Sequence, residues 1–310
     1  MGAREAAAVT DRAADASPPG GGPPGFLVIG HAVQDLLPDG DPPAWRLGGA
    51  VAYASCLAVK LGLDTAVLTS AGPDIDLASA FPGVDVANVP SKTSTRFRNV
   101  YGKDRRQQYL PSRAAPITPD DLPAPWRQAQ IVLLGPVADE VDPALAGCFP
   151  GALVGVGAQG WLRETGPDTA VRALPPEEWD DQPILRFATA LFLSNEDIPP
   201  EASATALQHW GEMVPTVAFT RGYDGTDIVH GGDRRHIDAF PATAVDPTGA
   251  GDVFASAFLI RFKECGDVWD AARFAACAAS FAVEGEGTAT IPDRHQIEER
   301  LRRNPDIIAR

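Results

Sequence analysis

Short apolar runs that alternate with helical segments are the feature that most restricts the fold of this chain. Each run is bounded by glycine, proline or polar residues, which is typical of strands buried on both faces of a sheet. We predict such strands at residues 26–30, 64–70, 84–89, 131–135, 153–157, 190–194 and 216–220. We predict helices at residues 51–61, 200–213, 255–262, 268–284 and 296–303. This alternation indicates an α/β fold, in which helices cover both faces of a mostly parallel sheet.

A glycine-rich segment late in the chain is expected to start a helix. Residues 246–252 have the sequence Asp-Pro-Thr-Gly-Ala-Gly-Asp and lead into an apolar run. Because proline and glycine interrupt strands, we expect Gly249, Ala250 and Gly251 to form the turn that opens this helix. The N–H groups and the dipole of a helix N-terminus attract anions, most naturally a phosphate. Asp252 would stand beside that anion, where a carboxylate can accept a proton from an attacking hydroxyl.

Residues near the first predicted strand give a second indication of a site. Asp35 lies beyond the carboxyl end of that strand, where open α/β sheets bind ligands. Gly48 and Gly49 precede the helix predicted at residues 51–61, and a glycine pair allows a backbone to approach a ligand closely. Glycine turns and first-turn aspartates also occur at helices without any function, so each feature alone is weak. The combination of the glycine turn and the first-turn aspartate at one helix is a more specific sign of a functional site.

Residues 246–254, taken with these earlier features, resemble the signature of ribokinase-like (PfkB-type) carbohydrate kinases. The resemblance extends over most of residues 26–292 and implies a ribokinase-like three-layer α/β/α sandwich with a small β lid. Residues 1–25 are rich in alanine and then in proline and glycine, and we expect them to be a disordered leader. We expect residues 26–310 to form a single kinase domain.

The lid is expected in two segments, at about residues 34–47 and 94–111. Residues 95–110 alternate in character on either side of a polar turn, as in a hairpin. Four arginines gather there in an otherwise acidic chain: Arg96, Arg98, Arg105 and Arg106. A solvated hairpin face would also explain them. The resemblance favours a lid that closes over the substrate and excludes water from phosphoryl transfer.

The resemblance implies three groups of site residues. The catalytic group holds the general base and the backbone amides that stabilise the transferred phosphoryl group: Asp252, Gly249, Ala250 and Gly251. The group expected to bind the acceptor substrate is Asp35, Gly48, Gly49, Gln159 and Arg163. The group expected to bind the nucleotide is Asn195, Thr220, Arg221, Gly222, Gly225 and Thr248. No metal ligands can be assigned.

The sequence departs from the family pattern at two positions. The asparagine that the family usually has in the helix at residues 51–61 would fall at Tyr53, and the glutamate that usually follows Asn195 would fall at Ile198. Glu196 or Asp197 could replace that glutamate. These departures motivate an alternative, a non-catalytic nucleotide- or sugar-binding protein on the same fold. The intact aspartate at the start of the late helix argues against this alternative.

The function implied by the resemblance is transfer of the γ-phosphoryl group of ATP to a hydroxyl of a small sugar or polyol. An inositol-like cyclitol, ribose, fructose and a nucleoside remain open as acceptors, and so does a phosphorylated sugar. The residues of these motifs are similar to those of inositol kinases in the family. ATP and Mg²⁺ are the implied cofactors, with a monovalent cation as an additional candidate. We expect a monomer or a homodimer formed through the lid.

Composition excludes several other classes of protein. The formal net charge of −15 argues against nucleic acid or an anionic membrane as the main partner. No apolar run reaches the roughly 18 residues of a membrane span, and the phosphate loop of P-loop enzymes is absent from the sequence. The four cysteines are scattered, so we expect reduced, buried thiols in a cytoplasmic protein.

Overall fold

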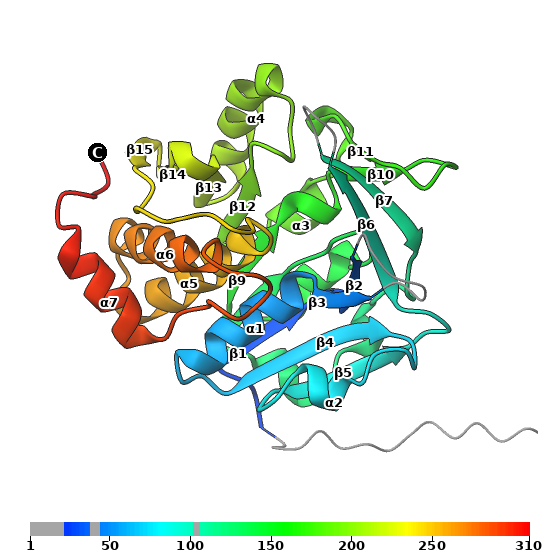
Figure 1. Cartoon of the computed structure of the whole chain (residues 1–310). Coiled ribbons are helices and arrows are strands. Elements are labelled where there is room, and N and C mark those ends of the chain that lie inside the picture. The colour runs from blue at the N-terminus through cyan, green and yellow to red at the C-terminus, as the bar shows by residue number, and fades with distance from the viewer. Residues whose placement is uncertain (1–21, 38–43, 102–105) are drawn as a thin grey trace, which may run out of the picture.

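The computed structural model describes residues 22–37, 44–101 and 106–310. Most of the predicted leader, the middle of each expected lid segment and Arg105 therefore lie outside the described residues. A nine-stranded sheet forms the centre of the molecule, in the order β15-β14-β13-β12-β9-β8-β1-β4-β5 (Figure 1). Its strands are β1 (Phe26–Ile29), β4 (Thr65–Ala71), β5 (Asp85–Pro90), β8 (Ile131–Leu134), β9 (Leu153–Gly157), β12 (Ala190–Ser194), β13 (Thr216–Thr220), β14 (Thr226–His230) and β15 (Asp233–Ile237).

The central sheet is parallel from β5 through β13, and β14 and β15 add an antiparallel edge. Strand β1 lies in the middle, with β4 on one side and β8 on the other. Its side chains alternate between two apolar layers. Phe26 and Val28 belong to one core cluster, and Leu27 and Ile29 belong to the other. A strand buried on both faces must read as a continuous apolar run, which is why the sequence reveals these strands.

Helices cover both faces of the central sheet, so the predicted α/β architecture is confirmed. Helices α1 (Ala50–Lys60), α5 (Ala250–Cys265), α6 (Val268–Ala282) and α7 (Arg294–Arg303) contribute to the first core cluster. Helix α4 (Pro200–Met213) and the short α3 (Gln182–Leu185) contribute to the second, and the one-turn helix α2 (Leu77–Ala80) flanks the first. Helix α6 ends before the predicted limit at residue 284, because Val283 already lies in the turn that follows.

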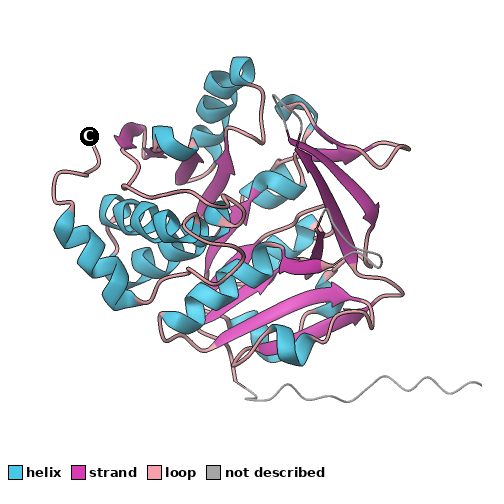
Figure 2. Ribbon diagram, in the orientation of Figure 1, coloured by secondary structure: helices cyan, strands magenta, loops and turns pink. Residues whose placement is uncertain are grey.

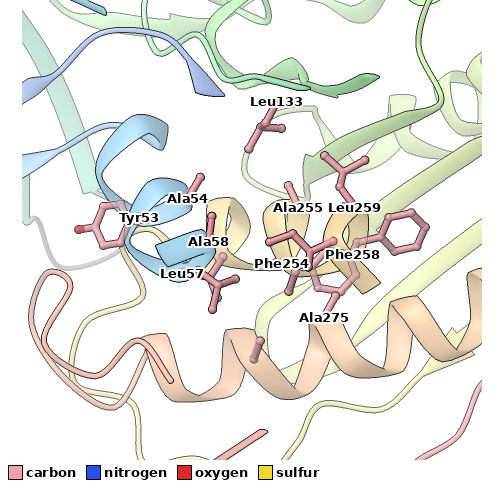
Figure 3. Packing of buried hydrophobic residues seen from close by; sticks show 14 of the residues in the cluster. Tyr53, Ala54, Leu57, Ala58, Leu133, Phe254, Ala255, Phe258, Leu259 and Ala275 are labelled. Atoms are coloured by element: carbon pink, nitrogen blue, oxygen red, sulfur yellow. The ribbon is translucent and has the colours of Figure 1, made fainter. Parts of the chain in front are cut away.

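Helix α5 is anchored deeply in the first cluster. Phe254 and Phe258 are almost fully buried and lie beside Leu57 of α1 and Ala275 of α6 (Figure 3). Small residues such as Ala275 let the two long helices approach closely. Removing one of these buried phenylalanine rings typically costs about 3–5 kcal/mol. The start of α5 is therefore held firmly in place, which matters for the groups it carries.

A separate four-stranded sheet stands to one side of the central sheet, in the order β3-β2-β6-β7 (Figure 2). Its strands are β2 (Val33–Leu36), β3 (Trp45–Gly48), β6 (Thr95–Tyr101) and β7 (Arg106–Ser112). These strands match the two segments expected to form a lid, about residues 34–47 and 94–111, to within one residue at their ends. The pair β6–β7 is the predicted hairpin, and β2 lies parallel to β6. Val33, Phe97 and Leu110 pack on Val137 and Ala138, which follow β8.

Two features of the fold were not predicted correctly. A two-stranded hairpin, β10 (Arg163–Thr165) with β11 (Val171–Ala173), was missed, and a bridge between Tyr109 and Ala170 attaches it to β7. The expectation of buried thiols is wrong for most of the cysteines. All four are free, but Cys277 alone is buried, Cys56 and Cys148 are half-buried, and Cys265 is exposed at the end of α5. Among the described helices, none combines the length and apolar character needed to cross a bilayer.

Candidate active site

The start of α5 has the geometry expected from the glycine-rich segment. Gly249 is the N-cap, with φ 81° and ψ −4°, a left-handed conformation that favours glycine. A Cβ atom added there would lie 2.2 Å from Cδ1 of Tyr53, so the ring of Tyr53 packs directly against the turn. Asp246 shapes the same turn, because its Oδ1 accepts a hydrogen bond from the N–H of Thr248 at 2.9 Å.

The N–H groups at this helix start remain open. No side chain caps Gly249. The N–H of Ala250 donates to the carbonyl of Pro247 at 3.2 Å, whereas across the described ranges those of Gly251 and Asp252 find no acceptor. Such orphan N–H groups at the positive end of the helix dipole form an anion-binding site.

The carboxylate of Asp252 stands next to these open amides in the first turn of α5. The residue is partly exposed. Burial raises the pKa of Asp252 to about 7, and the negative charges of Asp197 and Asp35 act in the same direction, against the opposing charge of Arg163. A carboxylate with a pKa near 7 is well matched to accept a proton at neutral pH.

Asp35 reaches this site from β2, and the glycine pair makes room for it. A Cβ atom on Gly48 would lie 2.1 Å from Oδ2 of Asp35, and one on Gly49 would lie 2.4 Å from the carbonyl oxygen of His31. Gly49 also has φ 85° and is the N-cap of α1. We expected the backbone of these glycines to approach a substrate closely. In the structure it closely approaches Asp35 and His31 of the protein itself. Direct contact of the glycines with a ligand stays a prediction.

Asp197 approaches Asp252 from the segment after β12. It is buried, and its Oδ2 accepts hydrogen bonds from the N–H and Oγ of Ser194 at 2.7 and 2.8 Å. Gln159, which follows β9, donates from Nε2 to Oδ1 of Asp197 at 3.4 Å. Ile198 belongs to the core, so Asp197 is the acid that this segment presents near Asp252. Gln159 and Arg163 therefore both lie in the neighbourhood of the proposed base.

The predicted nucleotide loop follows β13. The N–H of Asn195 donates to the carbonyl of Thr220 at 3.0 Å, which joins the ends of β12 and β13. Gly222 and Gly225 have φ values of 56° and 80°, and a Cβ atom on Gly225 would lie 2.2 Å from the carbonyl oxygen of Ile237. Glycine is therefore required at Gly225 by packing.

Arg221, in the same loop, is turned toward Asp227 of β14. Its Nη2 donates to Oδ1 of Asp227 at 3.1 Å, and Arg234 and His236 also bind this carboxylate. These residues line an open cavity of about 570 Å³, and the Nε of Arg221 is buried without a partner in the described structure. The predicted contact of Arg221 with phosphate oxygens remains a prediction.

Arg46 is a residue of the site that sequence reasoning missed. It is the cross-strand neighbour of Asp35, and its Nη1 and Nη2 bind Asp246 at 3.0 Å and Glu286 at 2.7 Å. The ion pairs join β3 of the small sheet to the segment that precedes α5. No local spacing could have revealed them, because the partners lie 200 and 240 residues away.

Comparisons with known proteins find relatives among the carbohydrate kinases. Residues 187–294 match the model of the pfkB family carbohydrate kinases. The inositol 3-kinase of Oryza sativa subsp. japonica is 30% identical over 253 residues, which cover 75% of this chain and 61% of that protein. The nucleoside kinase of Methanothermobacter thermautotrophicus is 44% identical over 92 residues, or 29% of each chain. The chain thus spans less than two thirds of the length of both relatives.

Solved structures show the same fold. A pyrophosphate-dependent kinase in the ribokinase family, complexed with a pyrophosphate analog and myo-inositol, has a TM-score of 0.73 and 21% identity, covering 89% of this chain and 99% of that one. The ribokinase of Arabidopsis thaliana, complexed with ribose and ATP, has a TM-score of 0.71 and 22% identity, covering 90% and 99%. Fold and site thus define an α/β domain of the ribokinase type. Residues 187–294 match the pfkB family of carbohydrate kinases, and the chain is similar to inositol and nucleoside kinases.

Proposed function

We propose that this protein transfers the γ-phosphoryl group of ATP to a hydroxyl of a small sugar or polyol. The observation that carries the proposal is the start of α5, where open N–H groups lie beside a carboxylate whose pKa is raised to about 7. A phosphoryl group needs positive dipoles to hold its charge, and the attacking hydroxyl needs a base. The start of α5 supplies both within one turn of helix.

The reaction follows from these positions. The acceptor oxygen attacks the γ-phosphorus, and its proton passes to the carboxylate of Asp252. The bond between the γ-phosphorus and the β–γ bridging oxygen breaks, so that ADP leaves with the electron pair. The N–H groups of Gly251 and Asp252 hold the negative charge on the transferred group. Asp35, which can accept hydrogen bonds only, would orient another hydroxyl of the acceptor.

Magnesium fits this site as an ion held mainly by the substrate. The described residues contain no group of three or more metal-ligating side chains, but Mg²⁺ with a nucleotide usually needs only one or two carboxylates besides phosphate oxygens and water. Asp197 and Asn195 would hold it near the donor. Bound there, the ion would neutralise charge on the β- and γ-phosphates.

The charge of the site favours an acceptor without a phosphate group. Asp35, Asp197 and Asp252 all bring negative charge to the reacting centre, opposed there by Arg163. A sugar phosphate bound among these carboxylates would be repelled. Arg96 of the small sheet already binds Asp74 and Gln34, which removes one predicted ligand for such a phosphate. We place cyclitols first among the acceptors, because the inositol 3-kinase of rice aligns with 75% of this chain.

The test is a panel of acceptors with two donors. Purified protein is incubated with Mg²⁺ and either ATP or pyrophosphate, with and without potassium, and with myo-inositol, ribose, fructose, nucleosides or their phosphates. We expect ADP release that depends on one unphosphorylated acceptor, with one phosphate ester formed per ADP. Binding of an acceptor without turnover under any condition would instead establish the non-catalytic binder. Turnover with pyrophosphate but not with ATP would show that pyrophosphate is the phosphoryl donor, and the proposed transfer to an acceptor hydroxyl would still hold.

We propose, in addition, a monomer or a homodimer formed through the small sheet. The outer edge of that sheet is β3, where Trp45 is 40% exposed. An open strand edge with an exposed aromatic side chain is a common site for pairing between chains. Light scattering at two protein concentrations distinguishes the two states, and a trimer or larger assembly would contradict both.

A further inference from the structure

His31 lies where the central sheet and the small sheet meet, between the end of β1 and the start of β2, and it is 0% exposed. Both ring nitrogens have partners. Nε2 lies 2.8 Å from the carbonyl oxygen of Ala115, and Nδ1 lies 2.7 Å from Oγ1 of Thr95. Because a carbonyl oxygen can only accept, Nε2 carries a proton, and in the neutral ring Nδ1 accepts from the Thr95 hydroxyl. These two bonds hold the ring in one orientation.

The partners of His31 belong to the two strands of one hairpin. Thr95 is the first residue of β6, and Ala115 lies just beyond the end of β7. Oγ1 of Thr95 also accepts from the N–H of Ala114 at 2.9 Å, which joins the two strands at the same place. The hairpin β6–β7 stands apart from the central sheet (Figure 2). His31 therefore bonds to the base of this hairpin at both of its strands.

Glu140, which follows β8, attaches His31 to the central sheet. The residue is 1% exposed, and its Oε1 accepts from the N–H of His31 at 3.0 Å. The same carboxyl group accepts from the N–H of Val137 at 3.0 Å and from that of Ala138 at 2.7 Å. Val137 and Ala138 are the residues on which the small sheet packs. One buried carboxyl group thus holds both His31 and the surface that supports the small sheet.

We propose that His31 is a positioning residue, which through Thr95 holds β2 and the hairpin β6–β7 in the arrangement that binds the acceptor. The inference rests on the proposed function, because it places the acceptor between Asp35 of β2 and Asp252. Strand β2 starts two residues after His31, and its Val33 is the register partner of Thr95. A shift at His31 would therefore move Asp35 and the hairpin together. When the binding arrangement is less populated, the acceptor binds more weakly by the same factor.

The T95V variant tests the proposal, because it removes the hydroxyl bound to His31 and keeps a branched side chain. We expect the KM of the acceptor to rise about 3- to 10-fold, the effect of one lost hydrogen bond, while the KM of the donor stays within about twofold. T95S keeps the hydroxyl and should restore the acceptor KM. T95A removes the same hydroxyl without placing a methyl group against the ring, and it replaces T95V if that variant does not fold.

The matched control is T216V. Thr216 is as deeply buried as Thr95, and its Oγ1 lies 2.9 Å from Nδ1 of His230. It therefore makes the same kind of hydrogen bond, but at the amino end of β13, away from the carboxyl ends of the strands. T216V should change neither KM.

Hydrogen exchange gives a readout that needs no substrate. In T95V the amides of β6 and β7 should exchange about 3- to 10-fold faster than in the wild type, because the base of the hairpin opens more often, and those of β12 and β13 should be unchanged. Unchanged exchange in the hairpin, an equal rise of both KM values, or an acceptor KM that T95S does not restore would overturn the proposal.

The failure of this inference can be distinguished from the failure of the proposed function. If the wild type turns over no acceptor, the proposed kinase function fails. Calorimetric binding of the same acceptors then replaces KM, and together with hydrogen exchange it still decides the role of His31.

Discussion

Asp252 has charged neighbours that lie far apart in the sequence. Its pKa is raised to about 7 first by burial and then by Asp197 and Asp35, with Arg163 opposing. In the unfolded chain these neighbours are absent, and the carboxyl should titrate near 3.8. The folded protein therefore carries a penalty for ionising this residue. The ionised carboxylate therefore destabilises the folded protein, but it accepts a proton readily at neutral pH. Raised carboxyl pKa values of this kind are common at catalytic sites.

This penalty predicts how the D252N variant responds to pH. Below about pH 4 the carboxyl is neutral in both states, so Asp and Asn should give similar stability. Between pH 4 and the folded pKa of about 7 the folded state alone holds the proton, so the wild type loses stability as the pH rises. Above pH 7 the difference stays constant, and D252N should be more stable by about 2 kcal/mol, less than the full shift implies because the side chain is partly exposed.

Urea unfolding of both proteins at intervals from pH 4 to pH 9 measures this difference directly. It needs no substrate, so it is independent of the assigned reaction. A stability difference that does not vary with pH would show that the carboxyl titrates normally in the folded state.

The start of α5 depends on two conditions at Gly249, a positive φ angle and the absence of a Cβ atom beside Tyr53. Gly62, after α1, meets the first condition without the second, because it has φ 85° and nothing within 4 Å of an added Cβ. We expect G62A to cost about 1 kcal/mol of stability for the strained backbone alone. G249A should cost about 1–3 kcal/mol more, because the added methyl group overlaps the ring.

A double-variant cycle separates the two contributions at Gly249. In a Y53A background the extra cost of G249A should fall to that of G62A, since the ring is no longer present. Thermal unfolding of the wild type, Y53A, G249A, Y53A/G249A and G62A gives the comparison. Equal costs for G249A and G62A in the wild-type background would contradict the contact between Gly249 and Tyr53.

Strand β3 is joined to the start of α5 by the partly buried ion pair between Arg46 and Asp246. Asp246 also holds the N–H of Thr248, so loss of Arg46 should disturb the turn itself. We expect R46M to destabilise the protein by about 1–2 kcal/mol and to lower kcat. The control is R310M, whose more exposed pair with Asp238 should contribute about 1 kcal/mol or less and leave kcat unchanged. Equal effects of the two variants on stability and kcat would contradict a link between β3 and the turn.

At the scale of the whole molecule, the sequence predicted those helices and strands whose formation depends on residues close together in the chain. The strands β12 and β13 and the helix α4 have the predicted bounds, because a buried apolar run and a helix with proline in its first turn are recognisable without neighbours. The turn at Gly249 and the first-turn position of Asp252 were predicted for the same reason.

The resemblance placed the lid segments, but the strands within them and other features that depend on distant residues could not be derived from local patterns. Strands β2 and β3 have four residues each, and β2 is ordered by pairing with β6, which follows about 60 residues later. The hairpin β10–β11 is a three-residue pair that lies on β7. Likewise, nothing near Tyr53 in the sequence shows that its ring would meet Gly249. In each case the partner is supplied by the tertiary fold.

The most direct test of the central claim compares wild type and D252N for both turnover and donor binding. The open amides of α5 should still hold the donor when the base is removed. We therefore predict that acceptor-dependent ADP release falls by a factor of about 10²–10⁴, while the Kd for ATP stays within about twofold. Turnover by D252N at the wild-type rate would contradict the account, because the proton of the acceptor hydroxyl would then have another destination.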